Sequence, residues 1–281
     1  NTTQPTVSEQ LKVLETRLGA QLVERSKSKV LLTPLGEQVV EIARRMLSDA
    51  NEIRALAASG GSELSGVLRL GLPSTIGPYL LPIVIPELQR TYPGLKLYVR
   101  EELPSSLPGS LQDGHFDLVI SLLPVKGAEL VDEPIFREPL SLAVSRDHPL
   151  AATGHVKRES LANIDVLALG KGHQLHDVVL ALCQDLGARL RFEYEGTSLD
   201  TLREMVAMGL GVTFLPGLYV KSVVARDKSV RIVELEGRTI YRTVGLVWRQ
   251  TSARHESYRA LAQLLRVQIQ KHFPEFAVLS K

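Results

Sequence analysis

The amino-acid sequence predicts a mixed α/β protein that consists of a small N-terminal module, one long helix and a larger domain of two lobes. Three observations support this prediction. Apolar residues recur at helical spacing before residue 20 and again between residues 35 and 56, and apolar strands alternate with helical segments from Val67 onward. The chain has 281 residues, of which 44% are hydrophobic, and this is enough for several folded units.

Composition excludes a membrane span and gives little indication of nucleic-acid binding. No run of about 18 apolar residues occurs, and the start "NTTQPTVSEQLKVLE" lacks the pattern of a secretory signal. The single cysteine permits no intrachain disulfide and fits a reducing compartment, so we expect a cytoplasmic protein without a membrane partner. A net charge of +2 indicates nucleic-acid binding only if the charges cluster.

The segment "TTQPTVSEQLKVLETRLG" predicts the first helix, which Thr3 can cap. Its apolar stripe consists of Val7, Leu11, Leu14 and Leu18. Near the N-terminus, the other face carries groups that could enter a major groove and reach bases and phosphates: Gln4, Pro5, Thr6, Ser8 and Lys12. A solvated helix face is the alternative. Because the sequence is helical from its start, we expect it to begin inside a domain.

A polar turn follows between two short strands in "LVERSKSKVLLT". Arg25, Lys27 and Lys29 alternate on one side of this segment, as expected of a basic wing that lies against a phosphate backbone.

Thr33 and Pro34 form the cap and first-turn signal of a long helix. Its apolar residues follow spacings of four and three, as in a coiled coil, with one break at Asp49: Leu35, Val39, Ile42, Met46, Ile53 and Leu56. Such a seam needs a partner helix, so we expect a dimer whose helix tips meet two operator half-sites. The stretch "ASGGSE", residues 58–63, is expected to be the flexible exit.

The order of these elements resembles that of the LysR-type transcriptional regulators, through "TQPTVSEQLKVLE", "LLTPLGE" and the helix after them. The resemblance implies a winged helix-turn-helix over residues 1–33 that lacks the family's first helix and most of its second. Residues 34–61 would be the linker helix and hinge. It also implies operator DNA, a small-molecule effector, RNA polymerase and further copies of the chain, in a dimer or tetramer, as partners.

The effector domain is expected over residues 62–281. A βαβ pattern in "VLRLGLPSTIGPYLLPIVIPELQRTYPGLKLYV" predicts a parallel sheet with helices on both faces, and "GHFDLVISLLP" predicts a strand that ends at Ser121. A second unit is expected to start near Pro139. We therefore expect a first lobe of residues 67–138 and 245–281 and a second lobe of residues 139–244, as in the periplasmic-binding-protein architecture.

Small polar residues at the ends of these strands predict an effector site in the cleft between the lobes, where helix N-termini suit a small anion. The candidates are Ser74, Thr75, Ser121, His173, Gln174, His176, Thr197, Ser198 and Pro216. The alternative for Ser74, Thr75, Thr197 and Ser198 is that they only cap helices.

The stretch "GKGHQLHDVVLALC" could instead hold a metal ion or a reactive thiol. His173, His176 and Asp177 are suitable metal donors, but their spacing is short and no second cluster supplies further ligands, so we expect no metal. Cys183 lies on the apolar stripe of its helix and is expected to pack as a small hydrophobe.

Within the LysR family, the chain resembles the OxyR peroxide-sensor branch, and in particular OxyR-like regulators of the LsrB or VtlR type. The stretches "GLPSTIGPYLLP", "TSLDTLREMVA" and "GVTFLP" carry this resemblance. It implies a reactive cysteine at the position of Gln174 and a resolving cysteine at that of Cys183. The branch's peroxide-pocket threonine is present as Thr75, and Pro104 replaces a second one. The intramolecular disulfide switch is therefore expected to be absent.

We therefore expect a DNA-binding regulator that responds to a small polar or anionic effector and needs no cofactor. An enzyme is not expected, because no nucleophile motif, phosphate loop or carboxylate pair accompanies His173 or His176. Two alternatives stay open: a thiol-responsive regulator that acts through Cys183, and a solute-binding protein with the same two-lobed fold. The latter does not explain the basic wing or the long helix.

Overall fold

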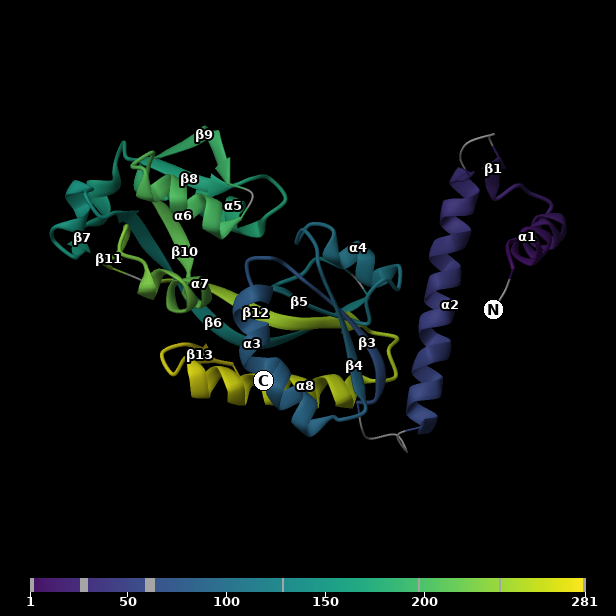
Figure 1. Ribbon diagram of the computed structural model, residues 1–281. Helices are drawn as coiled ribbons and strands as arrows, with labels where there is room; N and C mark the ends of the chain where they lie inside the picture. The colour runs from purple at the N-terminus through teal and green to yellow at the C-terminus, as the bar shows by residue number, and fades with distance from the viewer. Residues whose placement is uncertain are drawn as a thin grey trace.

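The computed structural model describes residues 3–25, 30–58, 64–127, 129–196, 198–237 and 239–279. It shows a small N-terminal module, the long helix α2 and a domain of two lobes (Figure 1). The predicted mixed α/β class is confirmed. Of the described helices, none is long and apolar enough to cross a membrane.

The N-terminal module contains α1 (Gln4–Leu18), β1 (Val23–Arg25) and β2 (Val30–Leu32), and α2 (Pro34–Ala58) follows it. Thr3 occupies the predicted N-cap of α1, but its hydroxyl lies 2.8 Å from the Thr6 hydroxyl instead of capping a described backbone N–H. Thr33 does cap α2, because its Oγ1 accepts a hydrogen bond from the Gly36 N–H at 2.9 Å.

The first lobe consists of β3 (Gly66–Leu72), α3 (Gly77–Thr91), β4 (Leu95–Glu101), α4 (Leu107–Gln112), β5 (Leu118–Leu122), α8 (His255–His272) and β13 (Ala277–Val278). The predicted βαβ unit is confirmed, since β3 pairs in parallel with both β4 and β5. Its core includes Ile76, Leu80, Trp248, Tyr258 and Phe136. The prediction that β5 ends at Ser121 was wrong by one residue, because buried Leu122 still pairs with β12.

The second lobe carries β7 (His155–Val156), β8 (Asp165–Leu169), α5 (Gln174–Leu186), β9 (Arg189–Gly196), α6 (Leu199–Ala207), β10 (Thr213–Pro216), α7 (Gly217–Ser222) and β11 (Val230–Leu235), with 3-10 turns at Pro149–Ala151, Arg158–Leu161 and Val224–Arg226. A separate apolar core fills it, which includes Leu167, Val179, Val206 and Phe214.

Two long antiparallel strands join the lobes: β6 (Leu130–Ser145) and β12 (Ile240–Arg249). They lie in a sheet of order β4-β3-β5-β12-β6-β11-β7, in which β10 and β13 also pair with β6. The expectation of a parallel sheet was wrong for the strands beside β6, because they run antiparallel to it. Outside β3, β4 and β5, parallel pairing also joins β8 to β9 and β7 to β11. The second unit does not start a new strand near Pro139 either, since β6 begins at Leu130. The predicted lobe boundaries at 138/139 and 244/245 stay a prediction, because both strands run through them.

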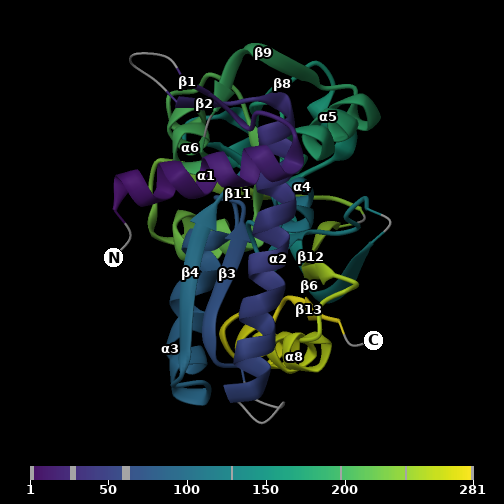
Figure 2. The same ribbon diagram turned by 90° about the vertical axis from the view of Figure 1, so that its right-hand side faces the viewer.

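Helix α2 runs along the first lobe (Figure 2). The turn after α4 touches it, since a β-carbon added to Gly114 would lie 3.2 Å from the Arg45 Cα. Arg44 Nη1 donates a hydrogen bond to His115 Nε2 at 2.7 Å. These contacts connect the long helix to the lobe that carries β3.

Candidate functional site

The polar residues predicted for the DNA-facing side of α1 are all exposed: Gln4, Pro5, Thr6, Ser8 and Lys12. Glu15 holds the wing in place relative to this helix, because its Oε1 accepts hydrogen bonds from the Leu22 N–H at 2.8 Å and the Val23 N–H at 3.2 Å. Arg25 ends β1, whereas Lys27 and Lys29 lie outside the described residues. The N-terminal module therefore presents a polar helix face beside a wing anchored to it.

A buried ion pair lies where the two lobes meet. Arg242 Nε donates to Glu138 Oε1 at 2.6 Å, and the Leu218 N–H donates to Glu138 Oε2 at 2.6 Å. Arg242 also donates to Thr75, to its carbonyl oxygen at 3.0 Å and its Oγ1 at 3.4 Å. The side chains of Arg242 and Glu138 are 3% and 0% exposed. We call Thr75, Glu138, Leu218 and Arg242 the hinge cluster, because they come from β3's loop, β6, α7 and β12.

The charges of the hinge cluster depend on one another. Burial raises the pKa of Glu138 above its usual value, and the Arg242 guanidinium and the Leu218 N–H offset part of this increase. A buried carboxylate with an ion-pair partner and a backbone donor stays charged far more easily than an isolated one. The sequence predicted Thr75 as an effector residue, but both of its oxygens accept hydrogen bonds from Arg242.

Two tyrosines form a second contact between the lobes. The rings of Tyr79 on α3 and Tyr219 on α7 meet edge to face with centroids 5.2 Å apart, and Tyr79 packs against both cores. The Tyr219 hydroxyl donates to Asp200 Oδ1 at 2.8 Å. Burial, and then the carboxylates of Asp200 and Glu101, raise the pKa of Tyr79 to about 12, so its hydroxyl is neutral at physiological pH.

The turn before α5 also lies against the first lobe. Gly172 has a φ of 95°, and a β-carbon there would lie 3.4 Å from Ser105 Oγ. After this turn, His173 Nδ1 and Gln174 Oε1 are buried and have no hydrogen-bond partner among the described residues. The same is true of Ser121 Oγ on β5. An unsatisfied buried polar atom costs about 1–3 kcal/mol, so such atoms call for a ligand or water. Burial, and then His176 nearby, lower the pKa of His173, which favours the neutral imidazole.

Of the other predicted effector residues, His176 and Ser198 have local structural roles. His176 is buried with its Nδ1 2.7 Å from the Leu169 carbonyl oxygen, and Ser198 caps α6 by accepting from the Thr201 N–H at 3.2 Å. Ser74 is half-buried, Pro216 is buried at the start of α7, and Thr197 lies outside the described residues. For Ser198, the structure thus supports the capping alternative.

Neither a metal centre nor a reactive thiol is visible near α5. No group of three or more His, Cys, Asp or Glu side chains in the described part of the chain could hold a metal ion. Cys183 is 3% exposed within the second core, and burial raises its pKa to about 11. The thiol is therefore almost entirely protonated at neutral pH.

Sequence reasoning missed Glu138, Arg242, Tyr79 and Tyr219. For Glu138 and Arg242, the available signal was a charge inside an apolar run, as in "REPLSLAV" and "TIYRTVGLVW". A charge at a buried strand position requires a partner.

Comparisons with known proteins agree across the chain. Residues 1–37 match the family described as bacterial regulatory helix-turn-helix protein, lysR family, and residues 61–270 match the LysR substrate binding domain. The DNA-binding transcriptional dual regulator OxyR of Escherichia coli strain K12 is 38% identical over 272 residues, which cover 96% of this chain and 88% of that protein. A probable hydrogen peroxide-inducible genes activator of Mycobacterium avium is 36% identical over 263 residues, 93% of this chain and 84% of that protein.

Solved structures are similar as well. A cysteine-to-aspartate variant of full-length OxyR from Pseudomonas aeruginosa superposes with a TM-score of 0.78 at 37% identity, over 94% of this chain and 86% of that one. A hydrogen peroxide-bound cysteine-to-serine variant of Corynebacterium glutamicum OxyR gives a TM-score of 0.74 at 30% identity, over 97% and 86% of the two chains.

Proposed function

The chain belongs to the LysR family of DNA-binding transcriptional regulators, in its OxyR-like branch, and on this premise we propose that a small polar or anionic effector controls it without an intramolecular disulfide. Members of this family are regulators and not enzymes. The helix-turn-helix match over residues 1–37 favours a regulator over the solute-binding alternative.

The observation that carries this proposal is the set of unpartnered buried atoms on Ser121, His173 and Gln174. A serine hydroxyl and a neutral imidazole can each donate one hydrogen bond, and an amide side chain can both donate and accept. These three groups suit hydrogen bonds to a small polar molecule or anion. The effector would select one arrangement of the lobes only if it binds that arrangement more tightly.

We expect no intramolecular disulfide, because the sequence has Cys183 as its single cysteine. Relatives bear the name hydrogen peroxide-inducible genes activator, so a thiol-responsive mechanism through Cys183 is the rival proposal. The burial of Cys183 and its raised pKa argue against this rival, because the thiolate is the reactive form.

We expect iodoacetamide to alkylate Cys183 in the folded protein about 100-fold more slowly at pH 8 than in the urea-unfolded protein, because a pKa near 11 leaves about a hundredfold less thiolate. Mass spectrometry of timed samples measures this rate, which should rise with pH up to about 11. Hydrogen peroxide should change the Kd for operator DNA by less than about twofold. A larger peroxide response that Cys183→Ser abolishes would establish the thiol mechanism instead.

We further propose that the N-terminal module contacts operator DNA and that α2 pairs with a second copy. In support, Leu35, Ile42, Met46 and Ile53 of the α2 seam are exposed in the single chain. The proposed DNA contacts are Gln4, Pro5, Thr6, Ser8 and Lys12 on α1 with Arg25, Lys27 and Lys29 on the wing.

In the full-length protein, Arg25→Ala should weaken binding to all DNA sequences and reduce the slope of log affinity against log salt by about 1, as expected for one lost phosphate contact. Gln4→Ala should instead reduce the difference in binding free energy between the operator and an operator with an altered base by about 1–3 kcal/mol. Fluorescence anisotropy over a salt series measures both, with Arg259→Ala on α8 as a control. If neither variant differs from the control, the proposed interface is wrong.

A further inference from the structure

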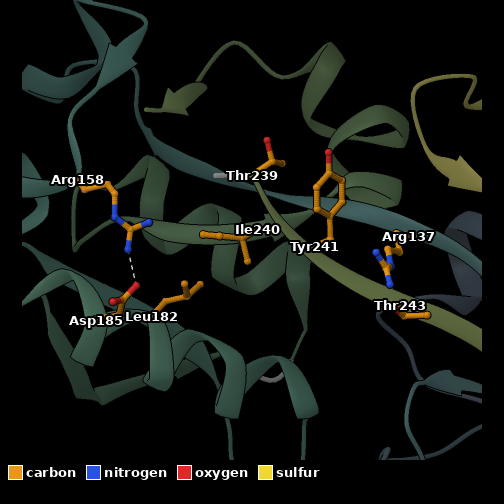
Figure 3. A pocket seen from close by; sticks show the side chains of 8 residues that line it. All are labelled: Arg137, Arg158, Leu182, Asp185, Thr239, Ile240, Tyr241 and Thr243. Atoms are coloured by element: carbon orange, nitrogen blue, oxygen red, sulfur yellow. Dashed lines mark hydrogen bonds and ion pairs between the residues drawn. The ribbon is translucent and has the colours of Figure 1, made fainter. Parts of the chain in front are cut away.

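A groove of about 710 Å³ lies on the face of the β6–β12 ladder opposite the hinge cluster (Figure 3). Side chains alternate between the two faces of a strand. Arg137 and Tyr241, the strand neighbours of Glu138 and Arg242, line this groove. We call it the rear groove. Its volume falls within the range of about 300–1,000 Å³ that is usual for small-molecule sites.

The rear groove contains one positive charge that no described side chain neutralises. Arg158 forms an ion pair with Asp185, which the dashed line in Figure 3 marks. The side chain of Arg137 is exposed, and its guanidinium makes no hydrogen bond or ion pair with any residue of the described ranges. A guanidinium presents parallel N–H donors that match the two oxygens of a carboxylate.

Ile240, Tyr241 and Leu182 give the groove an apolar surface, beside the hydroxyl groups of Thr239 and Thr243. Figure 3 shows Ile240 and Tyr241 between Arg158 at one end and Arg137 at the other. Leu182 on α5 also lines the groove, and it and Ile240 are half-buried, so their outer surfaces are available to a ligand. An apolar floor of this kind, next to a single free cation, fits a ligand with one anionic end and a hydrocarbon body.

We propose that the rear groove binds a small organic monocarboxylate, with the carboxylate on Arg137 and the apolar body on Ile240, Tyr241 and Leu182. This site is distinct from the effector site proposed above. Arg137 lies on β6 where β13 of the first lobe pairs with it, whereas Leu182 belongs to α5, whose first residue is Gln174. A ligand that touches both would favour one arrangement of the lobes and so modulate the response to the first effector.

The test uses hexanoate as the probe and isothermal titration calorimetry on the full-length protein. We expect saturable binding in the range of about 0.1–1 mM, which Arg137→Gln weakens about tenfold or more and Tyr241→Ala weakens less. Arg146→Gln, at an exposed arginine outside the groove, is the matched control and should leave binding unchanged. Hexanamide, which lacks the charge, should bind about tenfold more weakly or worse.

Far-ultraviolet circular dichroism should show that Arg137→Gln folds normally, as expected at an exposed position. The proposal would be overturned by no saturable binding up to about 10 mM hexanoate, by equal binding in Arg137→Gln, or by loss of binding in Gln174→Ala. The last result would place hexanoate at the proposed effector site of Ser121, His173 and Gln174, so it separates this proposal from the one on the first effector. Inorganic phosphate that displaces hexanoate would also contradict a site specific for carboxylates.

Discussion

Replacing Arg242 with methionine is expected to lower the free energy of unfolding by about 3–5 kcal/mol, because it leaves the buried Glu138 carboxylate without its ion-pair partner. Among the described residues, the Leu218 N–H alone would still donate to that carboxylate. Urea unfolding, followed by the fluorescence of Trp248, measures the loss. This residue is the chain's single tryptophan and is fully buried on β12.

Three comparisons make this result specific to the hinge cluster. Arg259→Met breaks an exposed pair with Glu256 and should cost less than about 1 kcal/mol. The double change Glu138→Gln and Arg242→Met should recover most of the loss, because no buried charge remains. The deficit of Arg242→Met should also shrink at lower pH, since without Arg242 burial keeps the Glu138 pKa raised and the acid becomes neutral. If Arg242→Met costs no more than Arg259→Met, the ion pair does not stabilise the fold.

The second large effect is expected at Gly36, in the first turn of α2. A β-carbon there would lie 2.0 Å from the Leu22 carbonyl oxygen, which is a backbone atom and cannot rotate away. That oxygen also accepts the Thr33 N–H at 3.0 Å, so Gly36→Ala should push the wing off the start of α2. We expect a cost of about 3 kcal/mol and a loss of operator affinity of about 100-fold, because the wing and α1 lose their fixed positions.

Gly109→Ala is the matched control for this prediction. Gly109 also lies in a helix, and apart from its chain neighbours and its own helix backbone no described atom lies within 4 Å of the β-carbon that alanine would add. Operator affinity, measured by anisotropy in the full-length protein, should fall only for Gly36→Ala, while Trp248 should report unchanged packing of the first lobe in both variants. Normal operator affinity in Gly36→Ala would show that DNA binding does not depend on this junction.

The elements with local signals were predictable from the sequence. Thr33 and Pro34 mark the start of α2, and the apolar runs around α3 predict the βαβ unit, because caps and periodicity act within a few residues. The effector residues with unpartnered atoms, Ser121, His173 and Gln174, were also among those predicted, since each lies at or near a strand end or helix start.

The strand β6 was not predictable in the same way. Pro134 and Pro139 interrupt its sequence, and a proline inside a predicted strand normally indicates its end or an edge. In the fold, these prolines pair with Gly245 and Tyr241 of β12 and lie within one continuous strand. Tertiary pairing overrides the local signal here.

The hinge cluster lay beyond sequence reasoning for a different reason. Arg242 is 104 residues from Glu138 and 167 from Thr75, so no spacing rule connects them. Ser198 shows the opposite limit, because a serine before a helix predicts a cap and a ligand contact equally well, and only the Thr201 N–H distinguishes them.

The continuous β6–β12 ladder also determines how the two lobes can move. Hinges in two-lobed proteins usually consist of a few residues that rotate freely, whereas here sixteen residues of β6, about 53 Å of strand, stay hydrogen-bonded to their neighbours. Rotation of one lobe relative to the other therefore requires a change in the twist of the β6–β12 strand pair, and the hydrogen bonds between the strands oppose that change. The register shift between Val244 and Gly245 is its most compliant point. An effector that changes the angle between the lobes would change the twist of this strand pair. When the effector dissociates, the strands would regain their original twist without a separate contact between the lobes.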